Sequence, residues 1–183
     1  MVGQLLIAPP AQTDDYWGKS VILMYEQTPQ TTLGLILNKQ SNSSFKDLAE
    51  HHGHTYNGDE MIFVGGPVNP SALVMLHTDD WSCTNTMYIP GTKLRISSDR
   101  TMLKRLCAGD RPALWKVFLG MSAWTQSQLE GEMSGQHPWS KKTAWLTAPS
   151  NTSIVFDTKS ERMWKRSIDS AAHSMVESYF SIS

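Results

Sequence analysis

Two apolar segments in the first quarter of the chain constrain the fold more than any other feature. Residues 21–24 read Val-Ile-Leu-Met and residues 35–37 read Leu-Ile-Leu, with no alternation of apolar and polar side chains. Strands that are apolar on both faces lie inside a sheet whose two sides are both covered. The polar residues 26–32 between the segments, Pro29 among them, suit a hairpin connection. We therefore expect two adjacent strands at the centre of a sheet.

Other short apolar runs, bounded by turn residues, predict the remaining strands. Each run has the length of an ordinary strand. The runs comprise residues 5–8, 61–64, 73–76, 94–96, 114–119 and 154–156.

Capping residues predict three short helices and one long helix. Ser44 with Asp47 resembles a capping box and begins the first helix. Ser98 begins the second, and Thr125 begins the third. Residues 158–161 are read as the capping box of the longest helix, along which apolar residues recur at helical spacing. These residues are Trp164, Ile168, Ala171, Ala172, Met175, Val176 and Tyr179.

The order of these elements predicts the fold class. Strands with interspersed helices and few crossovers of βαβ length favour an α+β fold with a mixed sheet over a doubly wound fold. The sequence contains no internal repeat, low-complexity tract or linker-like shift in composition. We therefore expect residues 1–183 to form a single domain.

Charge and cysteine content exclude several classes of protein. The 16 Lys and Arg residues against 17 Asp and Glu residues leave no excess of positive charge for phosphate backbones or anionic lipids, which argues against nucleic acid as the main partner. Cys83 and Cys107 form no Cys-x-x-Cys pair, and we expect both to be reduced. The N-terminus lacks a basic signal region, and no segment approaches the roughly 18 apolar residues of a membrane span. A cytoplasmic protein is expected.

A histidine cluster near residue 51 offers a weak candidate metal site. Asp47 and His51 stand four residues apart on one helix, and His54 follows, so the three side chains could share a metal ion. The simpler interpretation is that imidazoles in a last helical turn bond its free carbonyl groups and interact with the negative end of the helix dipole. We favour this capping role and expect no metal or other cofactor.

Two further motifs resemble catalytic loops incompletely. Residues 120–124 read Gly-Met-Ser-Ala-Trp, close to the nucleophile elbow of acyl-transfer enzymes, but Trp124 replaces the last glycine. Gly65 and Gly66 follow a predicted strand as a phosphate loop would, yet the Lys-Ser/Thr pair of such a loop is missing. A tight turn around Ser122, and a strand end or close backbone crossing at the glycines, are the favoured interpretations.

Seven tryptophans are numerous for a chain of this length. Most should lie in the core. Trp139 stands in loop-like sequence beside Lys141 and Lys142, so it is our candidate for an exposed aromatic anchor for a partner.

The order of short motifs along the chain resembles the YqgE/AlgH family. The motifs are Leu6-Ile7-Ala8-Pro9-Pro10, Ser20-Val21-Ile22-Leu23, Leu33-Gly34-Leu35-Ile36-Leu37-Asn38-Lys39, Gly65-Gly66-Pro67-Val68, Leu76-His77, Leu119-Gly120, Ala123-Trp124, Gln128-Leu129-Glu130-Gly131-Glu132 and Trp145-Leu146-Thr147-Ala148-Pro149. The resemblance implies a compact α+β fold with a bifurcated, barrel-like sheet. It implies no activity, although transcriptional regulation has been proposed for some members. Departures at Gln40, Ala123, Gln126 and Ser127 leave a changed partner open.

The leading functional hypothesis is a non-catalytic binding or regulatory protein that acts through a protein partner, because no acid–base pair, metal cage or phosphate loop stands out. The second is a small enzyme or ligand-binding protein whose pocket is lined by Asn38, Gly65, Gly66, His77 and Trp124. The third is a DNA-associated transcriptional regulator, which would require one basic stripe combining two distant segments. The residues of that stripe would be Lys104, Arg105, Arg162, Lys165 and Arg166.

Overall fold

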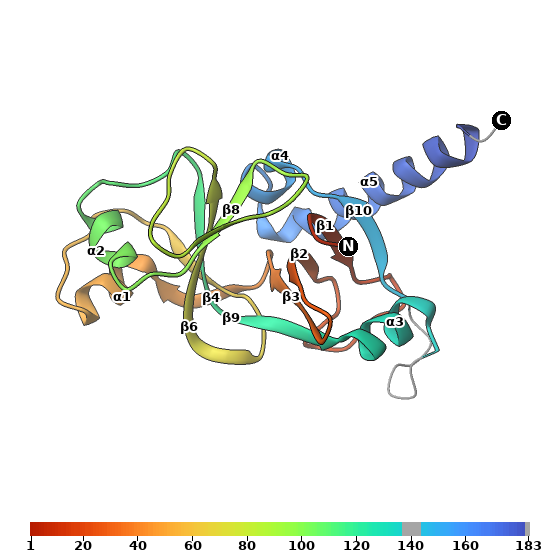
Figure 1. Ribbon diagram of the computed structural model, residues 1–183, viewed down its shortest axis with the longest axis horizontal. Coiled ribbons are helices and arrows are strands. Elements are labelled where there is room, and N and C mark those ends of the chain that lie inside the picture. The colour runs from red at the N-terminus through yellow and green to blue at the C-terminus, as the bar shows by residue number, and fades with distance from the viewer. Residues whose placement is uncertain (137–143, 182–183) are drawn as a thin grey trace.

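The computed structural model describes residues 1–136 and 144–181, which form a curled sheet with helices around it (Figure 1). The strands are β1 (Gln4–Ile7), β2 (Val21–Gln27), β3 (Thr31–Ile36), β4 (Gln40–Ser44), β5 (Met61–Val64), β6 (Val68–Thr78), β7 (Thr86–Tyr88), β8 (Leu94–Ser97), β9 (Trp115–Thr125) and β10 (Leu146–Pro149). The helices are α1 (Phe45–His51), α2 (Met102–Cys107), α3 (Gln126–Ser134), α4 (Thr152–Phe156) and α5 (Ser160–Phe180).

Strand β9 joins the two parts of the sheet. In the described residues the strand order is β10-β1-β2-β3-β9-β6-β8-β7, with β5 also paired to β9 and β4 paired to β5. The second half of β9 pairs with β3, whereas its first half pairs with β6 and, in parallel, with β5. The sheet therefore branches at β9 and mixes parallel with antiparallel pairs. The predicted α+β fold with a bifurcated, barrel-like sheet is confirmed.

The two central strands are buried as the sequence predicts. Residues Val21 to Met24 are each 0% exposed, and Leu35 to Leu37 are at most 1% exposed. Their strands β2 and β3 pair antiparallel through a short hairpin, in which the Thr28 amide donates to the carbonyl of Thr31. Burying each Leu or Ile of this kind stabilises the fold by roughly 1.5–3 kcal/mol.

Three glycines allow two segments of backbone to cross at close range. An ideal Cβ on Gly65 would lie 2.3 Å from the carbonyl oxygen of Gly120, and one on Gly120 would lie 2.4 Å from that of Gly66. Gly120 also has a φ of 73°, which favours glycine. The crossing predicted for Gly65 and Gly66 is therefore observed. Ser122, beside it, lies buried within β9 and donates to the Gly65 carbonyl, so no turn of any kind presents its hydroxyl.

The predicted helix starts are correct in two cases. Ser44 and Asp47 form the capping box of α1, and the Thr125 side chain accepts from the Gln128 amide at the start of α3. Helix α2 begins later than expected, after Thr101, because Ser98 donates to the carbonyl of Leu73 instead of capping the helix.

Two predictions near the C-terminus are wrong. Residues 154–156 form part of helix α4, not a strand, because the Asn151 side chain accepts from the Ile154 amide and caps a helical turn. The expected capping box of α5 is absent: Lys159 occupies the N-cap position without a side-chain bond, since the Thr158 hydroxyl donates to the carbonyl of Ser153.

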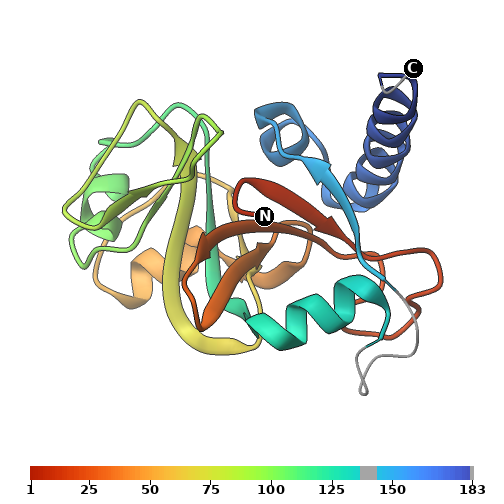
Figure 2. The same ribbon diagram turned by 45° about the vertical axis from the view of Figure 1, so that its right-hand side comes forward.

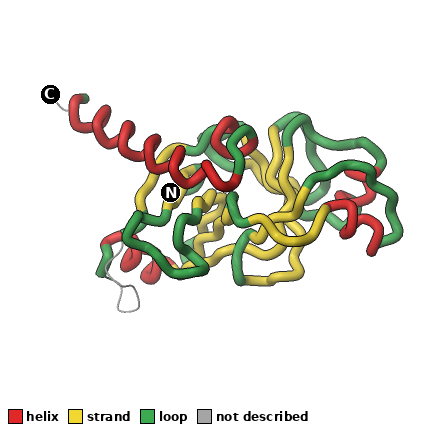
Figure 3. Tube along the Cα trace, turned by 180° about the vertical axis from the view of Figure 1, so that it is seen from behind, coloured by secondary structure: helices red, strands yellow, loops and turns green. Residues whose placement is uncertain are grey.

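Helix α5 packs against the sheet over its first half only. Met163, Ser167 and Ala171 are buried, whereas the last turns extend away from the molecule beyond β10 (Figure 2). Seen from behind, the same helix end projects from one end of the chain (Figure 3). Across the described residues, each helix is too short or too polar to cross a lipid bilayer.

Candidate functional site

The five residues predicted to line one pocket lie in separate environments. Asn38 fastens two segments together: its Oδ1 accepts from the Val21 amide at 3.0 Å, and its Nδ2 donates to the Lys19 carbonyl at 2.9 Å. Backbone atoms of β9 occupy the space beside Gly65 and Gly66, where the two segments cross. His77 and Trp124, described next, are buried in different parts of the core. Trp139, the predicted aromatic anchor, lies outside the described residues.

His77 belongs to a buried chain of hydrogen bonds. The side chain is 0% exposed, its Nδ1 lies 2.7 Å from the Thr78 carbonyl, and its Nε2 lies 2.8 Å from the Ser97 hydroxyl. Because a carbonyl only accepts, Nδ1 carries the proton and Nε2 accepts from Ser97. The Ser97 oxygen lies 2.7 Å from the Thr86 hydroxyl, which can donate to it. Burial lowers the pKa of His77, so the ring is held neutral inside the fold.

Trp124 and Trp145 share one carboxylate. Their indole Nε1 groups donate to Oε2 of Glu132 at 3.1 and 2.9 Å, and Gln128 donates to the other oxygen at 3.0 Å. Trp17 packs against both rings, with centroids 6.1 and 6.2 Å away. The cluster ties α3 to the sheet, and we interpret it as structural.

The histidine cluster does not converge. The Asp47 carboxylate accepts from the amide and hydroxyl of Ser44, and this bonding lowers its pKa. Among the described residues, no three His, Cys, Asp or Glu side chains are placed to hold a metal ion. His52, not His51, bonds a helix carbonyl, with Nδ1 at 2.9 Å from the Leu48 oxygen.

The residues of the proposed DNA-binding stripe lie on two separate helices. Lys104 and Arg105 belong to α2, whereas Arg162, Lys165 and Arg166 belong to α5. Figure 1 places α2 at one end of the molecule, whereas α5 begins near the middle, beside α4, and runs toward the opposite end. Arg105 also bonds Asp110 at 2.6 Å and the Ser82 carbonyl at 2.8 Å.

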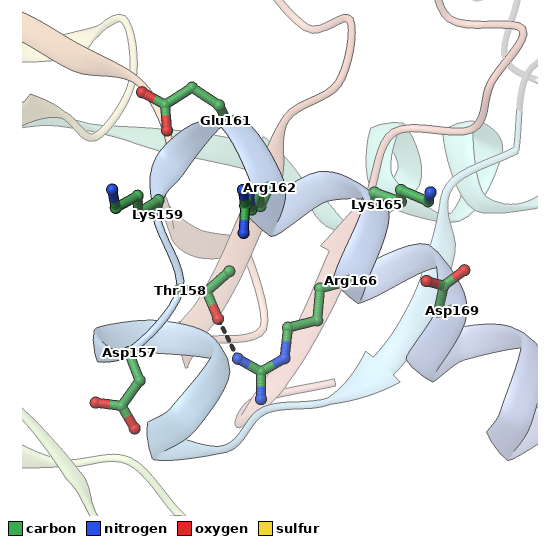
Figure 4. A pocket seen from close by; sticks show the side chains of 8 residues that line it. All are labelled: Asp157, Thr158, Lys159, Glu161, Arg162, Lys165, Arg166 and Asp169. Atoms are coloured by element: carbon green, nitrogen blue, oxygen red, sulfur yellow. Dashed lines mark hydrogen bonds between the residues drawn. The ribbon is translucent and has the colours of Figure 1, made fainter.

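Three cavities adjoin one another around the start of α5, and Glu161 lines all of them. The helix-side cavity, of about 640 Å³, is lined by the link between α4 and α5 and by the first half of α5 (Figure 4). The Lys116 cavity, of about 350 Å³, lies between this helix start and strands β4, β5 and β9. The Asn38 cavity, of about 440 Å³, continues toward residues 15–20. The residues that line the helix-side cavity are Asp157, Thr158, Lys159, Glu161, Arg162, Lys165, Arg166 and Asp169.

The helix-side cavity combines cations with carboxylates, and one of its cations is already engaged. Arg166 donates to the Thr158 hydroxyl (Figure 4). It also donates to the Ser153 hydroxyl, and so it connects α5 to α4. Within the described residues, Arg162 and Lys165 make no ion pair within 4 Å.

The Lys116 cavity contains a group that the sequence analysis missed. Lys116 is half-buried on β9, with Nζ 4.8 Å from the centroid of the Phe63 ring. In the described part of the chain, no carboxylate pairs with it. Burial alone lowers its pKa to about 8. A sequence signal did exist: this lysine interrupts the apolar run of residues 114–119.

The end of α5 presents the second candidate surface, an apolar stripe. We call Ile168, Ala172, Met175, Val176 and Tyr179 the α5 stripe, because their spacing puts them on one side of the helix. Met175 is 63% exposed, Val176 52% and Tyr179 77%, and no described element covers them. The side chains that continue the buried face toward the C-terminus are Ser174 and Ser178, which explains why the helix leaves the sheet here.

Comparisons with known proteins agree with this architecture. Residues 5–175 match the sequence profile of a family described as AlgH-like. A UPF0301 protein from Polaromonas is 32% identical over 172 residues, covering 89% of this chain and 84% of that protein, and one from Variovorax paradoxus is 31% identical over 176 residues with the same coverage.

Solved structures show the same fold. The solution structure of the AlgH protein from Pseudomonas aeruginosa superposes with a TM-score of 0.75 at 26% identity, covering 92% of this chain and 87% of that one. A crystal structure of a protein from Corynebacterium diphtheriae gives a TM-score of 0.70 at 20% identity over 89% of this chain and 83% of that one. From its sequence and its fold alike, the chain belongs to the AlgH-like family.

Proposed function

We propose that this protein is a non-catalytic binding protein that acts through a protein partner held on the α5 stripe. The observation that carries the proposal is the exposure of Met175, Val176 and Tyr179. These three large apolar side chains share one side of a helix that projects from the fold. Contiguous exposed apolar surface of this kind marks interaction sites in soluble proteins. Burying one such side chain contributes roughly 1.5–3 kcal/mol.

The charges beside the stripe indicate what kind of partner fits. From residue 168 to residue 180 the chain carries Asp169 and Glu177 and no Lys or Arg. An amphipathic helix with its own apolar stripe and flanking Lys or Arg residues would satisfy both the apolar surface and the carboxylates. Interfacial membrane helices have a polar face rich in Lys and Arg, so a lipid surface fits the last turns of α5 poorly.

The test is affinity capture from lysate of the source cells, followed by titration of each captured protein in purified form by isothermal calorimetry. We expect one partner at equal stoichiometry. Met175→Glu or Tyr179→Glu should weaken its binding by at least about tenfold, because each change places a charge in the apolar contact. Ser178→Glu adds the same charge in the same turn but outside the stripe, so its binding should match that of the unsubstituted protein.

Two results would overturn this proposal. In one, every purified partner binds the stripe variants and the Ser178→Glu control equally. In the other, sedimentation shows a dimer that Tyr179→Glu dissociates, which would assign the stripe to a second copy of this chain.

A Trp139→Ala variant in the same titrations tests the anchor predicted from sequence: if Trp139 contributes to the interface, its loss weakens binding independently of the stripe.

A further inference from the structure

We propose that the Lys116 cavity binds a small phosphate-bearing anion, with the Lys116 ammonium group as its principal contact. This site is separate from the α5 stripe and does not depend on the function proposed above. Its walls come from β4 through Gln40, β5 through Phe63, β9 through Lys116, and the link between α4 and α5.

The first argument is the missing counter-ion of Lys116. Its long side chain lies half-buried over Phe63, and no carboxylate of the described residues lies within 4 Å of its Nζ. Removing an ammonium group from water costs free energy unless a partner compensates for the lost hydration. The aromatic face supplies only part of this compensation. An anion that enters the cavity would supply the rest.

The second argument is the start of α5, which forms another wall of the same cavity. This helix is 21 residues long, and no side chain caps its first turn. The first amides of a helix have no acceptor within the helix, and they favour negative charge through the helix dipole. Ser160 and Lys159 line the cavity at this point. The Arg162 amide donates to the Lys159 carbonyl, so among the described residues the amides of Ser160 and Glu161 are the ones without an acceptor in the first turn. Such amides and a lysine are the two kinds of group with which proteins bind phosphate.

Two carboxylates on the wall limit the size of the ligand. Asp157 and Glu161 line the cavity together with Lys159 and Lys116, so the four charges sum to zero. A carboxylate close to Lys116 would raise the pKa of its ammonium group. The pKa is lowered instead, and burial is the cause. Because no carboxylate of the described residues lies within 4 Å of the Lys116 Nζ, a compact anion can contact this group directly, whereas the balanced charge of the wall disfavours a nucleic-acid backbone. We expect selective but modest binding of a single phosphate group.

The experiment monitors Lys116 directly by NMR of its side-chain Cε and Nζ signals, with inorganic phosphate and phenyl phosphate as probes. We expect saturable binding at pH 7 with a dissociation constant on the order of 1 mM or lower. Because the anion stabilises the charged amine, saturating probe should raise the pKa of Lys116 by about one unit or more if binding is at least tenfold tighter to the charged form. Binding should weaken as the pH rises above about 8, where the free amine loses its proton.

Two variants test whether Lys116 forms the site, and a competing anion tests its ligand class. Lys116→Met keeps an apolar stem over Phe63 and should weaken binding at least about tenfold. Lys104→Met removes an exposed lysine on α2 and should leave binding unchanged. Equal binding by Lys116→Met, or no saturable shift of the Lys116 signals in the unsubstituted protein, would overturn the site. Acetate that binds as tightly as phosphate would overturn the assignment of its ligand class.

Discussion

His77 stands in the middle of a hydrogen-bond chain that a neutral ring satisfies, and burial favours that neutral form. In the neutral ring Nδ1 donates to the Thr78 carbonyl and Nε2 accepts from Ser97, so a second ring proton requires the Ser97 hydroxyl to rotate toward Thr86. Burial is the main cause that lowers the pKa of His77, and the nearby charge of Arg95 acts in the same direction. The hydrogen bond to Thr78 and the charge of Asp80 oppose this shift without reversing it.

This arrangement predicts that stability falls on mild acidification. The pKa of His77 is lower in the folded chain than its unfolded value near 6.5, so its full contribution is present above pH 6.5 and is lost as the pH falls toward the folded pKa. Each unit of lowering corresponds to about 1.4 kcal/mol. Urea unfolding at pH 7.5, 6.5 and 5.5 should show this decline. The loss of stability between pH 7.5 and pH 5.5 should be smaller in His77→Gln. It should be unchanged in His173→Gln, because this change is at an exposed site. Equal stability at the three pH values would contradict the prediction.

Helix α5 illustrates how an element can be divided between folding and binding. The part up to Ala171 contributes Met163 and Ala171 to the main core, while the last turns contribute no buried side chain. We predict that a chain ending at Ser174 loses less than about 1 kcal/mol of unfolding free energy, since surface changes rarely exceed this. Met163→Ala should cost about 2–5 kcal/mol because it leaves a cavity. Urea denaturation of both variants measures the difference, and a similar loss in the two would mean that the helix end packs on the fold.

The elements also show how far the sequence predicts the structure. The central strands and the α1 cap were predictable, because unbroken apolar runs and reciprocal Ser–Asp bonding have few alternative structures. Residues 154–156 were misread, since a short buried run is compatible with strand or helix and only the Asn151 cap distinguishes them. Strand β4 reads Gln-Ser-Asn-Ser-Ser and was missed because it contains no apolar residue.

The candidate site was less predictable than the fold. The Lys116 cavity joins residues from β4, β5, β9 and the α4–α5 link, and only the branched sheet brings these segments together. The spacing of these residues along the sequence does not predict that they line one cavity. The residues predicted to line one pocket lie apart: Gly65 stands at the backbone crossing, whereas Asn38 bonds two segments and lines the Asn38 cavity.

At the scale of the whole molecule, β9 makes the two parts of the sheet depend on each other. Its first half pairs with β6 and β5 and its second half with β3, so neither part is complete without it. Gly120 lies where these pairings meet and where the backbone of Gly66 crosses. We therefore predict one cooperative unfolding transition, with far-UV circular dichroism and tryptophan fluorescence giving the same midpoint.

Two glycine variants test this dependence. Gly53 and Gly120 have similar φ angles of 76° and 73°, but a Cβ on Gly53 would meet no atom within 4 Å, whereas one on Gly120 would meet the Gly66 oxygen at 2.4 Å. Gly53→Ala should therefore cost only the backbone strain of about 1–2 kcal/mol. Gly120→Ala should cost more, because the crossing must separate, and it should lower both spectroscopic midpoints together. If Gly120→Ala shifts one midpoint and leaves the other in place, the sheet unfolds in two parts and the chain is not a single cooperative unit.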